Sequence, residues 1–205
     1  KVKPNNYDIL AGRVKMQSIF DVPLIEIKHD LMPVWQFSLK RVFDVVISLS
    51  ALFLLSPLFL ISTILVKIGS QGPVFFYQER IGIHGGLFKI IKFRSMFIDA
   101  EKNGPQLSSD SDPRITKWGN IMRRYRIDEL PQFWNVLIGE MSLVGPRPER
   151  EFYAKQIIEK APHYKHLQKV KPGVTSWGMV RYGYASSVDE MIERLRYDII
   201  YIENM

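Results

Sequence analysis

The chain has 205 residues and no cysteine, so it is long enough for one domain with a substantial core, and disulfide frameworks and thiolate metal sites are excluded. Its net charge of +7 predicts an anionic partner, for which nucleic acid, anionic lipid and phosphorylated small molecules all qualify. The sequence starts at Lys1 rather than methionine and stops at Met205 within a helical pattern, so we expect a piece of a longer protein.

Residues 1–36 carry no motif that points to a particular chemistry. Pro4, Gly12 and the short apolar run at residues 20–27 predict a strand and loops. We expect this segment to be a linker or the remnant of a preceding domain.

The strongest hydrophobic signal is residues 45–66, which include no charged side chain. About 20 apolar residues are enough to cross a bilayer as a helix. Lys40 and Arg41 precede the run and Lys67 follows it. Basic residues at both ends favour a cytoplasmic location for both ends.

Ser56 and Pro57 lie at the middle of this run. Proline removes one helical hydrogen bond and its ring clashes with the preceding turn, so we expect the helix to bend there. A central break between two basic ends is typical of a re-entrant hairpin, which enters one leaflet and returns. A spanning helix with a proline kink and a buried core helix are the alternatives.

A basic β-hairpin is predicted after the apolar run. Residues 74–77 and 87–94 have strand propensity, and Gly85 and Gly86 supply turn chemistry between them. Four polar side chains near the strand ends are candidates to converge on an anion: Gln78, Arg80, Lys92 and Arg94. The alternative is a solvated hairpin that faces lipid headgroups.

Residues 99–113 are polar and interrupted by glycine and proline, which predicts a short helical start and a loop. The acidic residues of this segment are Asp99, Glu101, Asp110 and Asp112, and their spacing fits no calcium-loop template. We interpret them as part of a solvated loop.

Residues 115–134 predict two helices joined near Asp128, and Gly139 is a plausible stop for the second. Asp128 and Glu129 follow three arginines at 123, 124 and 126. An acidic pair before a helix can cap it and offset its positive end. A carboxylate surrounded by arginines can instead face an anionic substrate, especially a phosphate.

The segment G-P-R-P at residues 145–148 fixes the backbone on both sides of Arg147, so this arginine is displayed with little freedom to lose. Its forked donors suit phosphate, although a plain rigid turn is the alternative. Residues 149–170 alternate in charge and predict one helix, and residues 188–205 predict an amphipathic helix. The fold class expected is α+β, mostly helical, with a small β-hairpin, a membrane-inserted re-entrant helix hairpin and amphipathic interfacial helices.

Several separated blocks carry a resemblance to a known family. They are Q-E-R-I-G from Gln78, K-F-R-S-M from Lys92, D-P-R-I-T from Asp112, I-D-E-L-P-Q-F-W-N-V-L from Ile127, M-S-L-V-G-P-R-P from Met141 and K-P-G-V-T-S-W from Lys171. In this order they resemble the bacterial sugar transferase family of monotopic phosphoglycosyl transferases. The last block has Ser176 at the family's usual glycine, and residues 178–184 depart from the common ending, so the sugar stays open.

The resemblance implies transfer of a sugar-1-phosphate from a UDP-sugar to polyprenyl (undecaprenyl) phosphate, with release of UMP, as the first membrane step of surface polysaccharide or glycoconjugate assembly. It implies that Asp128 attacks the β-phosphate to form a covalent aspartyl-phosphosugar, with Glu129 as a metal or acid–base partner. The implied cofactor is Mg²⁺ at Asp128 and Glu129. The implied substrate- and phosphate-binding residues are Gln78, Arg80, Lys92, Arg94, Arg114 and Arg147.

The resemblance also favours the re-entrant form of residues 37–68, followed by a catalytic domain at residues 69–205 that we expect to be truncated at its C-terminus. It implies a site at the cytoplasmic face of the bacterial inner membrane, with membrane lipids as partners, and it leaves homo-oligomer formation open. The alternative function is a non-catalytic basic and aromatic module that docks on membrane surfaces. No nucleic-acid partner is expected, because the chain has no recognised nucleic-acid motif and carries a hydrophobic anchor.

Overall fold

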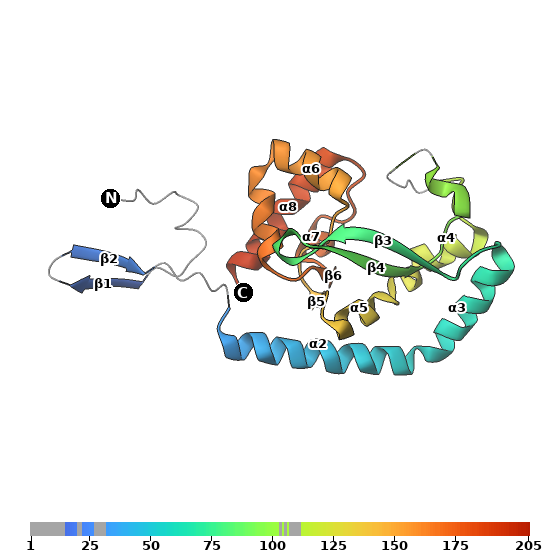
Figure 1. The fold of residues 1–205 in the computed structure, drawn as a ribbon, viewed down its shortest axis with the longest axis horizontal. Helices are drawn as coiled ribbons and strands as arrows, with labels where there is room; N and C mark the ends of the chain where they lie inside the picture. The colour runs from blue at the N-terminus through green and yellow to red at the C-terminus, as the bar shows by residue number, and fades with distance from the viewer. Residues whose placement is uncertain (1–14, 20–21, 27–31, 103, 105, 107–111) are drawn as a thin grey trace.

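The structure is a computed structural model that describes residues 15–19, 22–26, 32–102, 104, 106 and 112–205 (Figure 1). Near the N-terminus, strands β1 (Lys15–Ile19) and β2 (Val22–Glu26) pair antiparallel. Strand is therefore present in residues 1–36, as expected. Residues 1–14, 20–21 and 27–31, where loops were expected, lie outside the described residues.

Two consecutive helices, α2 (Val34–Leu54) and α3 (Ser56–Gly69), form the apolar part of the chain. They meet at Leu55 and are bent by 60° (Figure 1). Pro57 lies in the first turn of α3, where the missing N–H needs no helical partner. The break predicted at residues 56–57 is thus confirmed. Among the described residues no single helix is long and apolar enough to cross a membrane, and this bent pair reaches that standard only together.

Helix α2 has its polar face turned inward. Asp44 is 5% exposed and Ser48 is fully buried, whereas Phe53 and Leu54 are 78% and 72% exposed. The polar residues recur at a helical spacing of four, so they fall on one face. That face packs on α5 (Gln132–Ile138) and β5 (Ser142–Val144), and the Leu143 amide donates to the Asp44 carboxylate at 3.0 Å. The outward apolar face is the reverse of what a water-facing helix presents.

The predicted β-hairpin is confirmed. Strands β3 (Phe75–Ile81) and β4 (Leu87–Phe93) pair antiparallel from Phe75 opposite Phe93 to Ile81 opposite Leu87, joined by a 3-10 turn at Ile83–Gly85. Phe93 is buried against Val66 and Met122. This small core fixes the hairpin to α3 and to α4 (Lys117–Arg124).

The two helices predicted around Asp128 are α4 and α5, and a 3-10 turn at Ile127–Glu129 lies between them. Arg126 enters this turn with φ 60°, in the left-handed region that L-residues rarely occupy. Gly139 ends α5 with φ 93°, so the predicted stop is also confirmed. The acidic pair therefore sits on a tight turn rather than inside a helix.

A short parallel pairing follows. Strand β5 aligns with β6 (Gly173–Thr175), with Ser142 opposite Gly173 and Val144 opposite Thr175. A Cβ atom on Gly173 would overlap the backbone of Gly145, so the two strand ends approach this closely only because both residues are glycines.

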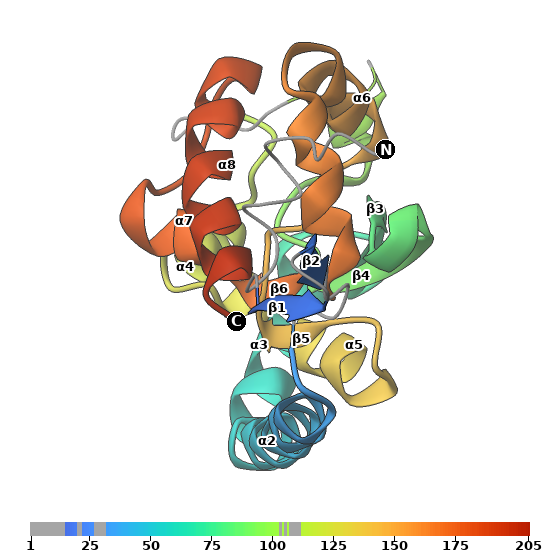
Figure 2. The ribbon, with the colours of Figure 1, turned by 90° about the vertical axis from the view of Figure 1, so that its left-hand side faces the viewer.

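The remaining helices are α6 (Glu151–Lys160), a 3-10 helix (Pro162–Lys169), α7 (Trp177–Arg181) and α8 (Val188–Glu203). The single helix predicted for residues 149–170 is wrong. Ala161 precedes a proline, which disfavours the helical backbone, and the chain continues beyond it as a tighter 3-10 helix. The largest core cluster joins α6, the 3-10 helix and α8, on the side of the molecule opposite α2 (Figure 2). The chain is mostly helical α+β, as expected.

Candidate active site

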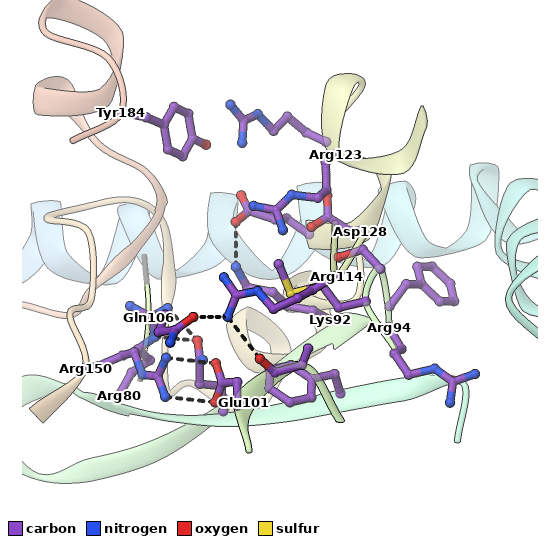
Figure 3. A pocket seen from close by; sticks show the side chains of 18 of the residues that line it. Arg80, Lys92, Arg94, Glu101, Gln106, Arg114, Arg123, Asp128, Arg150 and Tyr184 are labelled. Atoms are coloured by element: carbon purple, nitrogen blue, oxygen red, sulfur yellow. Dashed lines mark hydrogen bonds and ion pairs between the residues drawn. The ribbon is translucent and has the colours of Figure 1, made fainter. Parts of the chain in front are cut away.

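A cavity of about 920 Å³ lies between the β3–β4 hairpin, the turn at Asp128, the segment after β5 and the start of α8 (Figure 3). Among the described residues that line it, nine are basic and four are acidic. Low-dielectric walls that carry an excess of one charge concentrate ions of the opposite charge. The cavity therefore suits a multiply charged anion.

Asp128 lies in the cavity wall and is 8% exposed. Its Oδ1 atom is buried and accepts no hydrogen bond from any described residue. The capping interpretation is wrong, because the N-cap of α5 is Pro131 and Asp128 lies three residues before it. Burial raises the pKa of Asp128 above its ordinary value, although the nearby Lys92 charge opposes that rise. Asp128 is therefore a poorly solvated carboxylate with one oxygen that no described residue hydrogen-bonds.

Glu129 has the opposite environment. Its Oε1 atom accepts from Lys92 Nζ at 2.7 Å and from an Arg147 terminal nitrogen at 3.2 Å. Burial alone would raise the pKa of Glu129, but the two cations outweigh burial and hold that pKa well below its ordinary value. Glu129 is therefore an anion at neutral pH that ties Lys92 of β4 to Arg147 of the G-P-R-P segment.

An aromatic ring bridges two of the arginines. The Arg126 guanidinium lies 3.7 Å from the centroid of Tyr184, and that of Arg147 lies 5.1 Å from the same centroid. Such contacts are attractive because the ring face is electronegative. Tyr184 comes from the connection between α7 and α8, and it faces Arg123 across the cavity in Figure 3. The C-terminal part of the chain thus completes one wall of the site.

Gln78 and Arg80, predicted to bind an anion, lie together on β3. Arg80 donates to Gln78 Oε1 at 2.5 and 3.1 Å and to the Pro148 carbonyl at 3.0 Å, and it lies 3.6 Å from Glu149. Burial lowers the pKa of Arg80 to about 10, so the side chain remains cationic at neutral pH. The two residues form the cavity wall nearest the start of α6.

Two further predicted residues, Arg94 and Arg114, line the cavity but also donate to groups of neighbouring loops. Arg94 donates to the carbonyls of Ser70 and Gln71 at 2.8 and 2.6 Å, and Figure 3 shows its guanidinium pointing away from Asp128. Arg114 forms two hydrogen bonds with the Asp112 carboxylate, at 2.8 and 2.6 Å. The geometry gives both arginines a structural role.

Several site residues escaped the sequence analysis. Glu101 pairs with Arg150 through two hydrogen bonds of 2.9 and 3.0 Å, and Glu149 pairs with Arg80. The short helical start predicted in residues 99–113 is the 3-10 helix Ile98–Glu101, and Glu101 is ion-paired although its side chain is 37% exposed. The interpretation as a solvated loop is wrong for the buried Asp112, while Asp110 lies outside the described residues. Glu149 and Arg150 directly follow the G-P-R-P segment, and this adjacency was the signal that could have found them.

The donor set fits a magnesium ion shared with a substrate. Within the described ranges, no group of three or more His, Asp or Glu side chains could hold a metal alone. Mg²⁺ in phosphoryl-transfer sites is often bound by one or two carboxylates together with substrate phosphates and water. The buried Oδ1 of Asp128, which has no hydrogen-bond partner among the described residues, would supply one such oxygen ligand.

A buried carboxylate with an unpartnered oxygen, beside a chain of ion pairs in a cationic cavity, is an arrangement suited to phosphorylated ligands. The comparison with protein families agrees with this class. Residues 35–205 match the family described as bacterial sugar transferase, and the chain belongs to that family.

Individual relatives carry more specific names. The chain is 40% identical over 197 residues to the UDP-N-acetylgalactosamine-undecaprenyl-phosphate N-acetylgalactosaminephosphotransferase of Aeromonas hydrophila, covering 96% of this chain and 46% of that protein. It is 36% identical over 198 residues to the UDP-glucose:undecaprenyl-phosphate glucose-1-phosphate transferase of Escherichia coli (strain K12), covering 96% of this chain and 42% of that protein. It is 40% identical over 173 residues to the exopolysaccharide production protein PSS of Rhizobium leguminosarum bv. phaseoli, covering 81% and 86% respectively. The chain thus spans less than half the length of the first two relatives.

Proposed function

We propose that this chain transfers a sugar-1-phosphate from a UDP-sugar to undecaprenyl phosphate or a similar polyprenyl phosphate. The observation that carries the proposal is the buried carboxylate of Asp128, whose Oδ1 has no hydrogen-bond partner among the described residues and which lines a strongly cationic cavity. The names of the relatives, which combine UDP-sugars with undecaprenyl phosphate, support the same substrates.

In the first half-reaction, an Asp128 oxygen attacks the β-phosphorus of the UDP-sugar. The new bond joins that oxygen to phosphorus, and the bond from the β-phosphorus to the bridging oxygen breaks, so that UMP leaves with the bridging oxygen. The product on the enzyme is an aspartyl-phosphosugar. Covalent catalysis divides one difficult displacement into two easier ones. The poor solvation of Asp128 supports this role, because little water must be stripped from the carboxylate before it attacks.

The neighbouring ion pairs hold the cations that meet the phosphates. Lys92 and Arg147 both contact Glu129, so the carboxylate fixes their positions without neutralising both of them. Positive groups fixed in advance stabilise charge that develops on phosphoryl oxygens. Because the pKa of Glu129 is held low, we assign it this electrostatic role rather than the acid–base role that the sequence also allowed. Arg80 and Gln78 are the next donors along the cavity wall.

In the second half-reaction, an oxygen of polyprenyl phosphate attacks the phosphorus of the aspartyl-phosphosugar. The bond from phosphorus to the Asp128 oxygen breaks, which restores the carboxylate and yields the polyprenyl diphosphate-sugar. The α2–α3 pair supports a membrane location for this step, because its outward face is apolar and its inward face binds the cavity-bearing domain. We propose that the pair enters the cytoplasmic leaflet as a re-entrant hairpin and brings the site to headgroup depth.

Magnesium completes the proposal. Asp128 and Glu129 would hold the ion together with diphosphate oxygens. When bound, Mg²⁺ neutralises charge on those oxygens and so favours phosphoryl transfer.

The decisive experiment measures UMP release from a panel of UDP-sugars by the purified, detergent-solubilised chain with Mg²⁺ and polyprenyl phosphate. Wild type should release UMP, and omission of the acceptor should leave a protein whose mass is increased by one phosphosugar. Asp128→Asn should abolish both signals, while Asp99→Asn, a carboxylate exposed on a surface turn, should retain them. Equal activity of wild type and Asp128→Asn would refute the assignment of the nucleophile. Silence of wild type with every donor, alongside binding to anionic vesicles, would favour the membrane-docking module.

A further inference from the structure

Helix α8 contacts the segments that form the candidate site through two buried ionic side chains, of which one, Arg194, also lines the cavity. Arg194 and Asp198 are 5% and 3% exposed and are four residues apart, so they lie one turn apart on the inner face of the helix. Their contacts converge on residues 147–149, the segment that displays Arg147 to the cavity. The rest of the buried face of α8 is apolar and includes Leu195 and Met191.

Arg194 contacts the C-terminal end of that segment, at Glu149. Its guanidinium forms a fully buried ion pair with Glu149, and Glu149 in turn lies 3.6 Å from Arg80 of β3. The pair therefore links α8 to the cavity wall through one carboxylate. A buried carboxylate shared by two arginines has both its position and its charge fixed by them.

Asp198 contacts the N-terminal end of the segment, at the Arg147 amide. It accepts from the Gly178 amide at 2.8 Å, and the Ser176 hydroxyl and the Arg147 amide also stabilise its charged form. A Cβ atom on Gly178 would lie 2.8 Å from Arg194 Cγ and 2.9 Å from Asp198 Oδ2. The close approach of α7 to α8 thus needs glycine here. The Asp198 carboxylate thus contacts both the segment that follows β5, at Arg147, and the segment that follows β6, at Ser176 and Gly178.

We propose that Asp198 and Arg194 are positioning residues, which fix the backbone at Arg147 and the carboxylate of Glu149 so that Arg147 and Arg80 meet the substrate phosphates in the productive geometry. This inference rests on the proposed function of the site. Buried ion pairs seldom stabilise a fold more than apolar side chains of the same size would. A helix needed only for packing would therefore gain little from Arg194 and Asp198.

The test measures kcat and KM for UMP release by Asp198→Asn and Arg194→Met, together with their melting temperatures. Misplacement of a catalytic group by about 1 Å can cost on the order of 100-fold in rate, so we expect each variant to lose about 10- to 100-fold in kcat. Arg194→Lys, which keeps the charge, should recover part of the loss. Leu195→Ala is the matched control for stability, because it removes a buried side chain of the same helix. It should lower the melting temperature and leave kcat near wild type at temperatures where the protein is folded.

A double-variant comparison separates positioning from a merely structural role. If Asp198 acts through Arg147, then Asp198→Asn should cost little further rate in an Arg147→Lys background, because the group it positions is already impaired. Additive losses, or a wild-type kcat in both Asp198→Asn and Arg194→Met, would overturn the inference while leaving the transferase proposal intact. Wild type that forms no UMP would overturn both. If Asp198→Asn does not fold, the same double-variant comparison is made with Arg194. Arg194→Met and Arg194→Lys are then each combined with Arg80→Lys, and each should cost little further rate in that background.

Discussion

Asp128 and Glu129 are adjacent in the chain but occupy opposite electrostatic environments. Burial dominates at Asp128 and raises its pKa, whereas ion pairs dominate at Glu129 and lower its pKa. Two neighbouring carboxylates whose pKa values are pushed apart are typical of sites with divided chemical roles. The pair itself could be found in the sequence. The divergence could not, because the partners of Glu129 lie 37 residues before it and 18 residues after it.

The buried Asp128 carboxylate, whose Oδ1 has no hydrogen-bond partner among the described residues, should lower the stability of the fold. Because burial raises the pKa of Asp128, the ionised form destabilises the fold at neutral pH, and lowering the pH through that raised pKa relieves the destabilisation. We expect Asp128→Asn to abolish UMP formation and to raise the unfolding free energy at pH 7 by about 1–3 kcal/mol, the typical desolvation penalty of an unsatisfied buried group. Denaturant unfolding in detergent at pH 7 and pH 5 measures this, and the advantage should shrink at pH 5.

Glu129→Gln is the matched control and should behave in the opposite way. The pKa of Glu129 is depressed, so its contribution to stability is present above the unfolded-state value of 4.5 and is lost as the pH falls below it. The variant should therefore be less stable than wild type at pH 7, with a smaller difference at pH 4. Identical unfolding curves for wild type and Asp128→Asn would contradict the assigned environment of Asp128.

The pH dependence of the reaction should follow Asp128. Its ionised form is the nucleophile, so UMP formation should decline as the pH falls through its raised pKa. Lys92 is the strongest influence that lowers this pKa, so Lys92→Met should move the acid limb of kcat/KM to higher pH as well as reduce the maximum. Arg123→Gln should move the limb in the same direction by less. Limbs at the same pH in all three proteins would show that another group controls the profile.

At the scale of elements, most local signals in the sequence were reliable, the missed end of α6 before Pro162 being an exception, whereas long-range pairings were not predicted. The hairpin of β3 and β4 and the break before Pro57 each depend on residues close together in the chain, and both were predicted. The parallel pairing of β5 with β6 was missed, because each strand has three residues and neither has a periodic pattern of useful length. This pairing nonetheless matters for the site, because it places the G-P-R-P segment beside α7, where Arg147 contacts Met179.

The contact between α2 and α5 gives a prediction about anchoring. Arg41 donates to the Val136 and Leu137 carbonyls at 2.6 and 2.7 Å, in the last turn of α5, where its charge also complements the negative end of the helix. We expect Arg41→Met to lower the unfolding free energy by about 2–3 kcal/mol, because these hydrogen bonds are charge-assisted. Thermal unfolding in detergent should reveal the loss. Lys67→Met, an exposed basic residue of α3, is the control that should change little. Equal losses in both variants would mean that charge alone, rather than the contact with α5, is responsible.

At the scale of the whole molecule, helix α2 turns a polar face toward the rest of the protein and an apolar face outward. Lys40 donates to Ser142 Oγ at 2.5 Å and to the Val144 carbonyl at 3.0 Å, next to the Asp44 contact with Leu143. The polar side chains of α2 are therefore used to attach the domain that holds the cavity. Hydropathy in the sequence predicted the apolar run, but it could not predict that its few polar neighbours face the protein. That orientation depends on strands and helices about 100 residues later in the chain.

The topology of the bent helix pair can be tested directly, because the chain has no cysteine and each introduced cysteine is unique. Ser38 near the start of α2 and Gln71 just after α3 are exposed and mark the two ends of the pair, and Leu54 lies beside the bend and is 72% exposed. If the pair is re-entrant, an impermeant maleimide should label Ser38→Cys and Gln71→Cys from the cytoplasmic side alone, in inside-out vesicles. Leu54→Cys should resist the reagent until detergent is added, because its exposed surface faces lipid. Labelling of the two flanking cysteines from opposite sides would establish a spanning helix with a kink, and would remove the reason for placing both ends of the pair beside one cytoplasmic active site.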